Sequence, residues 1–316
     1  MIYKSQKKIS RRIAIVGTNT NELFTTIRSG MIARLDKEDN LSYTFGVANG
    51  ANDEAGMKDV VREVIFARHY DLLLSIGKSS TRIAHQLTRT YRAPIPIFFT
   101  SVLEPVQSGF IKSTENSGNN LTGFEAFERN YTDQMETLLH IIEKPLKKVL
   151  VLYAQFTYSI HAQEIIALLD WLKEHNIPTV SIGLENGTNA GQEIMSILPS
   201  IDMVILPRDS TLVSFIEDII CACNLYRKPI YASDLTSVEL GASMGFGSDE
   251  FLVGFMTAEK ALPILLYNEK PINIPTTLTP WEPKLLINRN GLIQQGLKIN
   301  FQKLEELVTV RTLIKG

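Results

Sequence analysis

The feature that most constrains this chain is a regular alternation of short apolar runs with amphipathic segments, which extends along almost its whole length. This alternation is typical of β-α-β units, in which helices cover both faces of a parallel sheet. Several of the apolar runs lack polar alternation, as expected of strands that are buried on both faces. Strands are predicted at 12–17, 43–47, 71–76, 95–101, 148–153, 179–183, 202–206 and 229–233.

Apolar residues recur at three- and four-residue spacing between these runs, for example within 57–65 and 165–172, and predict helices with one core-facing side. The polar, turn-rich stretch 115–120 interrupts the alternation and cannot continue a strand or a helix. Four β-α pairs are predicted before it and about four after it. We therefore expect two similar Rossmann-like halves rather than one long sheet, although no close sequence repeat accompanies them.

The bulk composition is that of a soluble globular protein. A length of 316 residues suits two medium α/β domains, and 44% hydrophobic with 21% charged residues is ordinary usage. A net charge of −2 lacks the basic surplus of a nucleic-acid binder, so no nucleic-acid partner is expected. The basic residues near the start are interpreted as part of a solvated arm at 1–10.

No apolar stretch reaches the roughly 18–20 residues of a membrane span, so no direct membrane insertion is expected. The basic start leads into only the apolar run 13–16, which is interpreted as a first strand rather than an export signal. The chain is expected in the periplasm or at the cell surface if a signal has been removed, and in the cytoplasm if it is the native full-length chain. Cys221 and Cys223 lie two residues apart on a predicted helix, and no disulfide between them is expected.

The turn after the predicted strand 71–76 has the composition of an anion site. Gly77 permits a tight turn, and Lys78, Ser79 and Ser80 follow at the opening of a helix. The free backbone N–H groups of a helix start favour a carboxylate or a phosphate. The alternative is that Ser79 or Ser80 only caps the helix.

Other strand-to-helix turns carry Glu104, Thr157, Tyr158, Asp209 and Asp234. Asp209 or Ser210 is alternatively explained as a helix cap and Asp234 as a turn former, and for each residue taken singly this explanation is favoured. Taken together, these turns place three carboxylates and several hydroxyls at the carboxyl ends of strands, where open parallel sheets bind ligands. Such a set suits a ligand that bears both an amine and a carboxylate.

Catalytic motifs are scarce. A phosphate-binding loop would need another glycine five residues before Gly77, where Leu72 stands. There is no nucleophile elbow, no glycine-rich dinucleotide loop and no paired metal-binding motif, so we expect no enzyme, no cofactor and no metal. The five histidines lie on predicted helix bodies or ends rather than in sheet-end loops; they are His69, His85, His140, His161 and His175.

Four blocks of this sequence resemble the ABC transporter substrate-binding proteins linked to tryptophan and tyrosine uptake. They are PIFFTSVLEPVQSG at 96–109, NNLTG at 119–123, PRDST at 207–211 and SDLTSVELGA at 233–242. The resemblance extends from about Ile13 to Ile299. Four such blocks in the same order are not expected by chance.

The resemblance implies a type I periplasmic-binding fold of class α/β. In that fold two Rossmann-like lobes with parallel sheets are joined by a three-crossover hinge, and one ligand is held between them. Lobe 1 is expected at 11–122 plus 241–275, and lobe 2 at 123–240 plus 276–316. The segments 121–123 and 241–242 resemble two of the crossings, and the predicted helix 251–266 is assigned to lobe 1 by resemblance.

The ligand positions of the family fit this chain unevenly. Asp209 and Asp234 match aspartates of the family, whereas Glu104 stands where the family usually has aspartate and Lys78 where it often has threonine. The loop 153–160 keeps Tyr153 and replaces most of the polar residues. The scaffold therefore carries over better than the specificity.

Three functions are weighed. The first is reversible binding of a small amino-acid-like ligand by hinge closure, with delivery to an ABC permease, as the resemblance implies. The second is a cytoplasmic sensor that keeps the same lobes and signals to a protein partner. The third is an enzyme on the same scaffold. The expected site comprises Lys78, Ser79, Ser80, Glu104, Thr157, Tyr158, Asp209 and Asp234.

Overall fold

The computed structural model describes residues 8–17, 21–49, 54–67, 69–126, 131–155, 158–185, 187–209, 211–279, 284–307 and 312–315. The chain divides into two compact units. Unit 1 comprises Met1–Phe127 and Glu250–Pro280, and unit 2 comprises Glu128–Asp249 and Trp281–Gly316. The chain therefore passes from one unit to the other three times.

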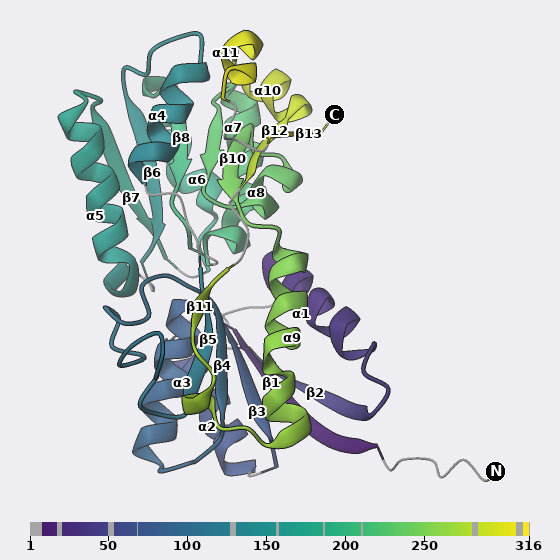
Figure 1. Ribbon diagram of the computed structural model, residues 1–316. Coiled ribbons are helices and arrows are strands. Elements are labelled where there is room, and N and C mark those ends of the chain that lie inside the picture. Colours follow the sequence, from purple (N-terminus) through teal and green to yellow (C-terminus); the bar gives the residue numbers. More distant parts are fainter. Residues whose placement is uncertain are drawn as a thin grey trace. The chain divides into compact units, whose positions relative to one another are not determined.

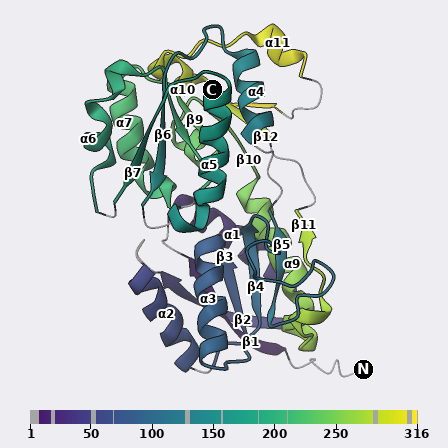
Figure 2. The same ribbon diagram turned by 90° about the vertical axis from the view of Figure 1, so that its left-hand side faces the viewer.

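Unit 1 is built on a six-stranded sheet in which every strand pair is parallel. Its strands are β1 (Ile9–Gly17), β2 (Leu41–Asn49), β3 (Leu72–Ile76), β4 (Ile97–Val102), β5 (Leu121–Glu125) and β11 (Thr277–Leu278), in the order β11-β5-β4-β3-β1-β2. Its helices are α1 (Glu22–Leu35), α2 (Glu54–Ala67), α3 (Lys78–Thr90) and α9 (Glu250–Tyr267), with the short 3₁₀ helix η3 (Pro271–Asn273). Helices α2 and α3 cover one face of the sheet, and α1 and α9 cover the other (Figures 1 and 2).

Two glycines allow α1 and α9 to pack at short range. A Cβ atom on Gly30 would lie 2.0 Å from the carbonyl oxygen of Phe251, and one on Gly254 would lie 1.9 Å from that of Ile27. No side chain fits at such distances, so the two backbones touch directly. Helix α9, which follows the second crossing, is fixed to unit 1 in this way.

Unit 2 is built on a seven-stranded sheet in the order β13-β12-β10-β9-β8-β6-β7. Its strands are β6 (Val149–Ala154), β7 (Thr179–Leu184), β8 (Met203–Leu206), β9 (Ile230–Ala232), β10 (Met244–Gly247), β12 (Lys284–Asn288) and β13 (Thr312–Lys315). Strand β12 runs antiparallel to β10, and the other pairs are parallel.

The helices of unit 2 also lie on both faces of its sheet. They are α4 (Tyr131–Ile141), α5 (Tyr158–Glu174), α6 (Ala190–Met195), α7 (Ile216–Tyr226), α8 (Leu235–Leu240), α10 (Arg289–Gln295) and α11 (Phe301–Glu305), with the 3₁₀ helices η1 (Leu198–Ser200) and η2 (Leu212–Phe215). Helices α4 and α5 cover one face, and α6 and α7 the other (Figures 1 and 2).

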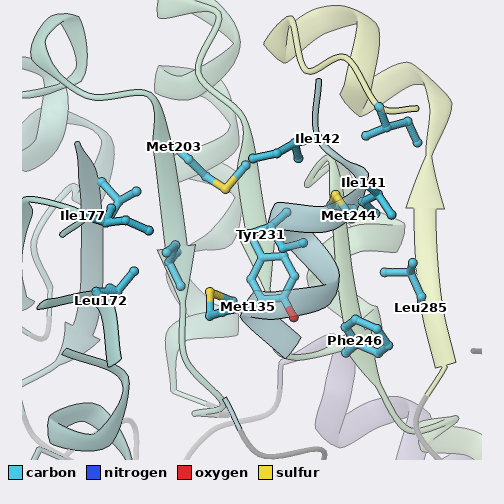
Figure 3. Close-up of a cluster of buried hydrophobic side chains, with 14 of the residues drawn as sticks. Met135, Ile141, Ile142, Leu172, Ile177, Met203, Tyr231, Met244, Phe246 and Leu285 are labelled. Carbon is cyan, nitrogen blue, oxygen red and sulfur yellow. The ribbon is translucent and has the colours of Figure 1, made fainter. Parts of the chain in front are cut away.

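A continuous apolar core joins the sheet of unit 2 to α4. Figure 3 shows Tyr231 and Phe246, from neighbouring strands, on the face that α4 covers with Met135 and Ile141. Tyr231 is fully buried, and its hydroxyl donates a hydrogen bond to Oε1 of Gln134 at 2.8 Å. Because a buried phenol needs such a partner, this contact fixes α4 against β9.

All eight strands predicted from the sequence are present, and the α/β class with two parallel-rich sheets is confirmed. The strand predicted at 12–17 begins earlier, at Ile9, so that the expected solvated arm 1–10 overlaps β1, and residues 1–7 lie outside the described part. Strands β5, β10, β11, β12 and β13 were not predicted. Met244–Gly247 alternates glycine with apolar residues, and glycine has low strand propensity.

The crossings lie beyond the boundaries expected from the sequence. The expected boundaries were 122, 240 and 275, whereas the chain changes unit after Phe127, Asp249 and Pro280. The stretch 115–120 is a turn inside unit 1 rather than its end, because β5 follows it and completes the sheet beside β4. Likewise 121–123 belongs to β5, and Gly241 is the C-cap of α8, ahead of β10.

Cys223 is buried and Cys221 is exposed, and both are free thiols. Burial raises the pKa of the Cys223 thiol to about 12, so it stays protonated and packs as an apolar side chain. Among the helices of the described segments, none combines the length and hydropathy of a membrane span.

Candidate functional site

Ligands of open parallel sheets bind at the carboxyl ends of the strands. In unit 1 the turn from β3 to α3 lies at this edge. Gly77 is the N-cap of α3 with a φ of 87°, a conformation that glycine adopts without strain. Lys78 is half-buried, and Ser79 and Ser80 are buried in the first turn of the helix.

The hydroxyl groups of this turn bond mainly to one another and to the backbone. Ser80 donates to the carbonyl oxygens of Ile76 and Gly77, and Thr81 Oγ1 donates to Gly77 at 2.8 Å. Ser75 Oγ lies 3.1 Å from Ser80 Oγ and 2.9 Å from Thr81 Oγ1. Ser80 therefore stabilises the turn by donating to its carbonyl oxygens and does not cap α3, whose N-cap Gly77 has no side-chain cap hydrogen bond. Lys78 and Ser79 lie in the same first turn of the helix.

The end of β4 and the loop that follows it contain the strained backbone of this edge. Ser101 and Glu104 have φ values of 57° and 48°, in the left-handed region that side chains disfavour. The side-chain oxygens of Thr100 and Ser101 are buried, and within the described residues neither has a hydrogen-bond partner. Backbone strain and buried hydroxyl groups without a hydrogen-bond partner are frequent at functional sites.

Glu104 is exposed at this loop and lies close to the half-buried Glu125 at the end of β5. Burial raises the pKa of Glu125, the negative charge of Glu104 raises it further, and a hydrogen bond from the backbone N–H of Glu104 opposes the shift. Two carboxylates therefore lie beside the unmet hydroxyls of β4.

In unit 2 the turns after β8 and β9 lie at the carboxyl edge of neighbouring strands. Asp209, which follows β8, accepts a hydrogen bond from the backbone N–H of Thr211 at 2.8 Å. The carbonyl oxygen of Asp209 accepts from the N–H of Leu212 at 2.9 Å. Oγ1 of Thr211 is buried, without a hydrogen-bond partner in the described part of the chain.

Asp234, which follows β9, is the N-cap of α8 and is 5% exposed. Its two carboxylate oxygens accept from the N–H of Ser237 at 2.6 Å and from Ser237 Oγ at 2.8 Å. Burial raises the pKa of Asp234, while the bonds from Ser237 and the positive charge of Arg208 oppose the shift. Asp234 thus caps a helix, whereas the sequence analysis weighed it as a turn former and Asp209 as the cap. A carboxylate in this position still has lone pairs for further donors.

Helix α4 supports both acidic turns from behind. The Tyr131 hydroxyl accepts from the backbone N–H of Arg208 at 3.1 Å. Gln134 Oε1, besides its bond from Tyr231, lies 3.3 Å from the donating Ser233 Oγ. The residues that precede Asp209 and Asp234 are therefore both held by α4.

The expected residues fall into two groups, one on each unit. Lys78, Ser79 and Ser80 share one turn of unit 1 and Glu104 lies on the neighbouring β4 loop, whereas Asp209 and Asp234 lie on adjacent loops of unit 2. Thr157 lies outside the described residues. Tyr158 is the first residue of α5, and its side chain lies outside them as well.

The sequence analysis did not select Thr100, Ser101, Glu125 or Thr211. All four lie next to or within the quoted sequence blocks, so the signal was present in the blocks. What marks them is a positive φ, a missing hydrogen-bond partner or a neighbouring carboxylate, and none of these is visible before the chain is folded. In the described part of the chain no three His, Cys, Asp or Glu side chains are grouped to hold a metal.

Comparison with known proteins shows one family for most of the chain. A family model for ABC transporter substrate binding proteins matches residues 13–310. A tyrosine-binding protein of Clostridioides difficile (strain R20291) is 26% identical over 295 residues, which are 92% of this chain and 82% of the relative.

Two solved structures share the fold. An ABC domain from Streptococcus pneumonia in complex with L-Trp has a TM-score of 0.79 at 17% identity, covering 96% of this chain and all of that chain. A conserved domain protein from Vibrio cholerae has a TM-score of 0.78 at 22% identity, covering 98% of this chain and all of that chain.

Proposed function

We propose, because this chain belongs to the ABC transporter substrate-binding protein family, that it binds one small amino-acid-like molecule reversibly and delivers it to an ABC permease. The ligand is held between the two units, and closure about the three crossings retains it. Closure of this type needs only a shift of a few kcal/mol between open and closed populations. The protein acts by binding, without turnover, on the outer side of the membrane.

The observation that carries the proposal is the polar composition of the two carboxyl edges. Buried hydroxyls that have no partner among the described residues occur at Thr100 and Ser101, at the end of β4, and at Thr211, in the turn that follows β8. A buried donor without a partner costs about 1–3 kcal/mol, and a ligand that accepts or donates there recovers this cost. The carboxylates and the lysine of the same edges supply charge.

Each charged residue has a proposed role. Lys78, with the N–H groups and the hydroxyls of Ser79 and Ser80, binds an acidic group of the ligand. Asp209 and Asp234 bind its cationic amine, because an ion that leaves water needs a charged partner. Thr157 and Tyr158 are proposed to complete the site from unit 2, and Glu104 to complete it from unit 1.

The relatives support an amino acid as the ligand, and the departures support a specificity of its own. One relative is named for tyrosine and one solved structure holds L-Trp. Lys78 and Glu104, however, differ from the usual residues of the family. We therefore propose a ligand that is more acidic or differently shaped than tryptophan.

The test is a thermal-shift screen with amino acids and related metabolites, followed by calorimetry. A ligand at about 100 times its dissociation constant adds about 2.7 kcal/mol of stability. Asp209→Ala should weaken the best ligand at least ten-fold, and Glu217→Gln, which removes an exposed carboxylate of α7, should leave affinity unchanged. Wild-type affinity in both Asp209→Ala and Asp234→Asn would overturn the assigned roles.

The specificity is tested with Lys78→Thr, which installs the residue common in the family. Affinity for the wild-type ligand should fall and affinity for tryptophan should rise. Tight tryptophan binding by the wild type that Lys78→Thr does not alter would show that these departures leave specificity unchanged.

A further inference from the structure

A hollow lies in unit 2 at the opposite end of its sheet from Asp209 and Asp234. Its volume is about 710 Å³. It is lined by Glu143, Arg227, Arg289, Leu292, Ile293, Gly296, Leu297, Lys298, Ile299 and Phe301. Glu143 and Arg227 precede β6 and β9, so the hollow lies where these parallel strands begin, beside α10 and α11 (Figure 1).

The walls of the hollow are held by backbone hydrogen bonds. The N–H of Glu143 donates to the carbonyl oxygen of Lys298 at 3.1 Å, and the N–H of Asn300 donates to that of Ile141 at 2.7 Å. Ile142 and Ile299 form an antiparallel bridge between these two bonds. The hollow is therefore a preformed part of the fold.

The floor of the hollow is apolar and partly open to solvent. Leu292 and Ile299 are 8% and 5% exposed and form its base. Ile293 and Phe301, at its sides, are 71% and 44% exposed. Two large apolar side chains left in water beside a buried apolar base form a surface that gains free energy when it is covered.

The rim of the hollow carries an excess of positive charge. Arg227, Arg289 and Lys298 are exposed and stand against one carboxylate, that of Glu143. Within the described residues, none of these three cations donates a side-chain hydrogen bond or forms an ion pair. Arg227 lies over Gly296, since its Nε is 3.6 Å from where a Cβ of that glycine would stand.

We propose that this hollow binds a small anionic amphiphile, whose acidic head group pairs with the cations of the rim and whose hydrocarbon chain covers the apolar floor. Guanidinium groups bind carboxylates and phosphates with paired hydrogen bonds, which the two arginines offer. The volume falls in the range of small-molecule sites, about 300–1,000 Å³. A stable protein interface needs about 800 Å² on each partner, more than this short apolar floor provides.

The probe is dodecanoate, used below its micelle concentration in titration calorimetry of the full chain. We expect saturable binding with one molecule per chain. Dodecyl maltoside, which has the same tail and an uncharged head, should bind at least ten-fold more weakly, and acetate should not bind. Equal affinity for the two dodecyl compounds would overturn the role of the cations.

Substitutions of the lining residues test whether dodecanoate binds in the hollow. Ile293→Glu adds a negative charge at a largely exposed position and should weaken dodecanoate at least ten-fold without lowering the melting temperature. Arg289→Gln should weaken it several-fold, and Lys303→Gln, which removes an exposed cation of α11 outside the lining, should have no effect. Absence of saturable binding, or wild-type affinity in Ile293→Glu, would overturn the proposal. So would self-association of the wild type that Ile293→Glu abolishes, because a second copy would then cover the hollow.

Discussion

The carboxyl edges of the two sheets differ in how their polar side chains are bonded. In unit 2, Asp209 and Asp234 accept hydrogen bonds from the residues that follow them, so the acidic turns are held by their own chain. In unit 1, the hydroxyls of Thr100 and Ser101 have no partner within the described residues, and Ser101 has a strained backbone. Unit 2 thus presents two carboxylates held by their own chain and one buried hydroxyl without a described partner, that of Thr211, whereas unit 1 presents two such hydroxyls, one of them on a strained backbone.

This difference suggests a division of labour in ligand binding. Charges held by a helix cap keep their position whether or not a ligand is present, and they set orientation and long-range attraction. Buried hydroxyls without a partner lower the stability of the folded state until a ligand forms hydrogen bonds with them. Ligand binding therefore raises the free energy of unfolding. Each edge can be altered separately, since the residues concerned belong to different units.

The largest effect is expected at the fixed charge of Asp234. Asp234→Ala removes the N-cap bond of α8 and leaves the Ser237 N–H without its acceptor, which should lower the free energy of unfolding by about 1–2 kcal/mol. Asp234→Asn keeps the acceptor and should stay within about 0.5 kcal/mol of the wild type at neutral pH. Urea denaturation measures both, and equal losses in the two variants would contradict the capping role.

The same residue predicts a pH dependence. Burial raises the pKa of Asp234 in the folded state above its unfolded value of about 3.9. The stability that the protonated carboxyl contributes is therefore complete below that pH and is lost as the pH rises through the folded pKa. The unfolding free energy of Asp234→Asn minus that of the wild type should increase from the acid range toward neutrality. A difference that stays constant with pH would contradict the raised pKa.

A matched pair of substitutions compares the two edges directly. Thr100→Val and Thr211→Val each remove a buried hydroxyl for which the described part of the chain offers no partner, and each keeps the side-chain shape. Each should raise the free energy of unfolding without ligand by about 1 kcal/mol, because an unsatisfied group disappears. The variant whose hydroxyl contacts the ligand should lose about ten-fold in affinity, as calorimetry would show.

If Thr100→Val loses affinity and Thr211→Val does not, unit 1 supplies the hydroxyl contacts. The reverse result would assign the hydroxyl contacts to unit 2 and contradict the proposed difference between the two edges. Destabilisation of either free variant would show that its hydroxyl has a partner, such as an ordered water, in solution.

The sequence was most informative where strands are long, apolar and followed by a helix. β3 and β8 are buried along their whole length and were predicted within one residue of their observed bounds. β10 was missed because Gly245 and Gly247 weaken the strand pattern, yet glycine is required there: a Cβ on Gly245 would lie 2.1 Å from the carbonyl oxygen of Ala232. Close backbone approach is a tertiary property, and no local pattern indicates it.

The candidate site was predictable in its place but less so in its details. Strand ends located Lys78, Asp209 and Asp234 from alternation alone. Whether the carboxylate of Asp234 caps a helix or binds a ligand depends on its rotamer and on Ser237, three residues later in the chain. Both roles are compatible with the same sequence. The left-handed backbone of Ser101 has no sequence signature, because serine has no preference for that region.

The smallest net effect on stability is expected at Ser101→Gly, and a comparison with Ser101→Ala separates strain from hydrogen bonding. Ser101→Gly removes a buried hydroxyl without a described partner and relieves the left-handed backbone, but it increases the entropy of the unfolded chain, so the free energy of unfolding should change by less than about 1 kcal/mol. Ser101→Ala keeps the strained backbone and removes only the hydroxyl.

The affinities of the two variants distinguish two roles of Ser101. If its hydroxyl forms a hydrogen bond with the ligand, both variants should lose affinity equally in calorimetry. If the loop geometry matters more, Ser101→Gly alone should lose affinity, because a freed backbone no longer holds the β4 loop in place before the ligand arrives. Wild-type affinity in both variants would show that Ser101 does not contact the ligand. Thr100 would then remain as the residue of β4 whose buried hydroxyl has no hydrogen-bond partner among the described residues.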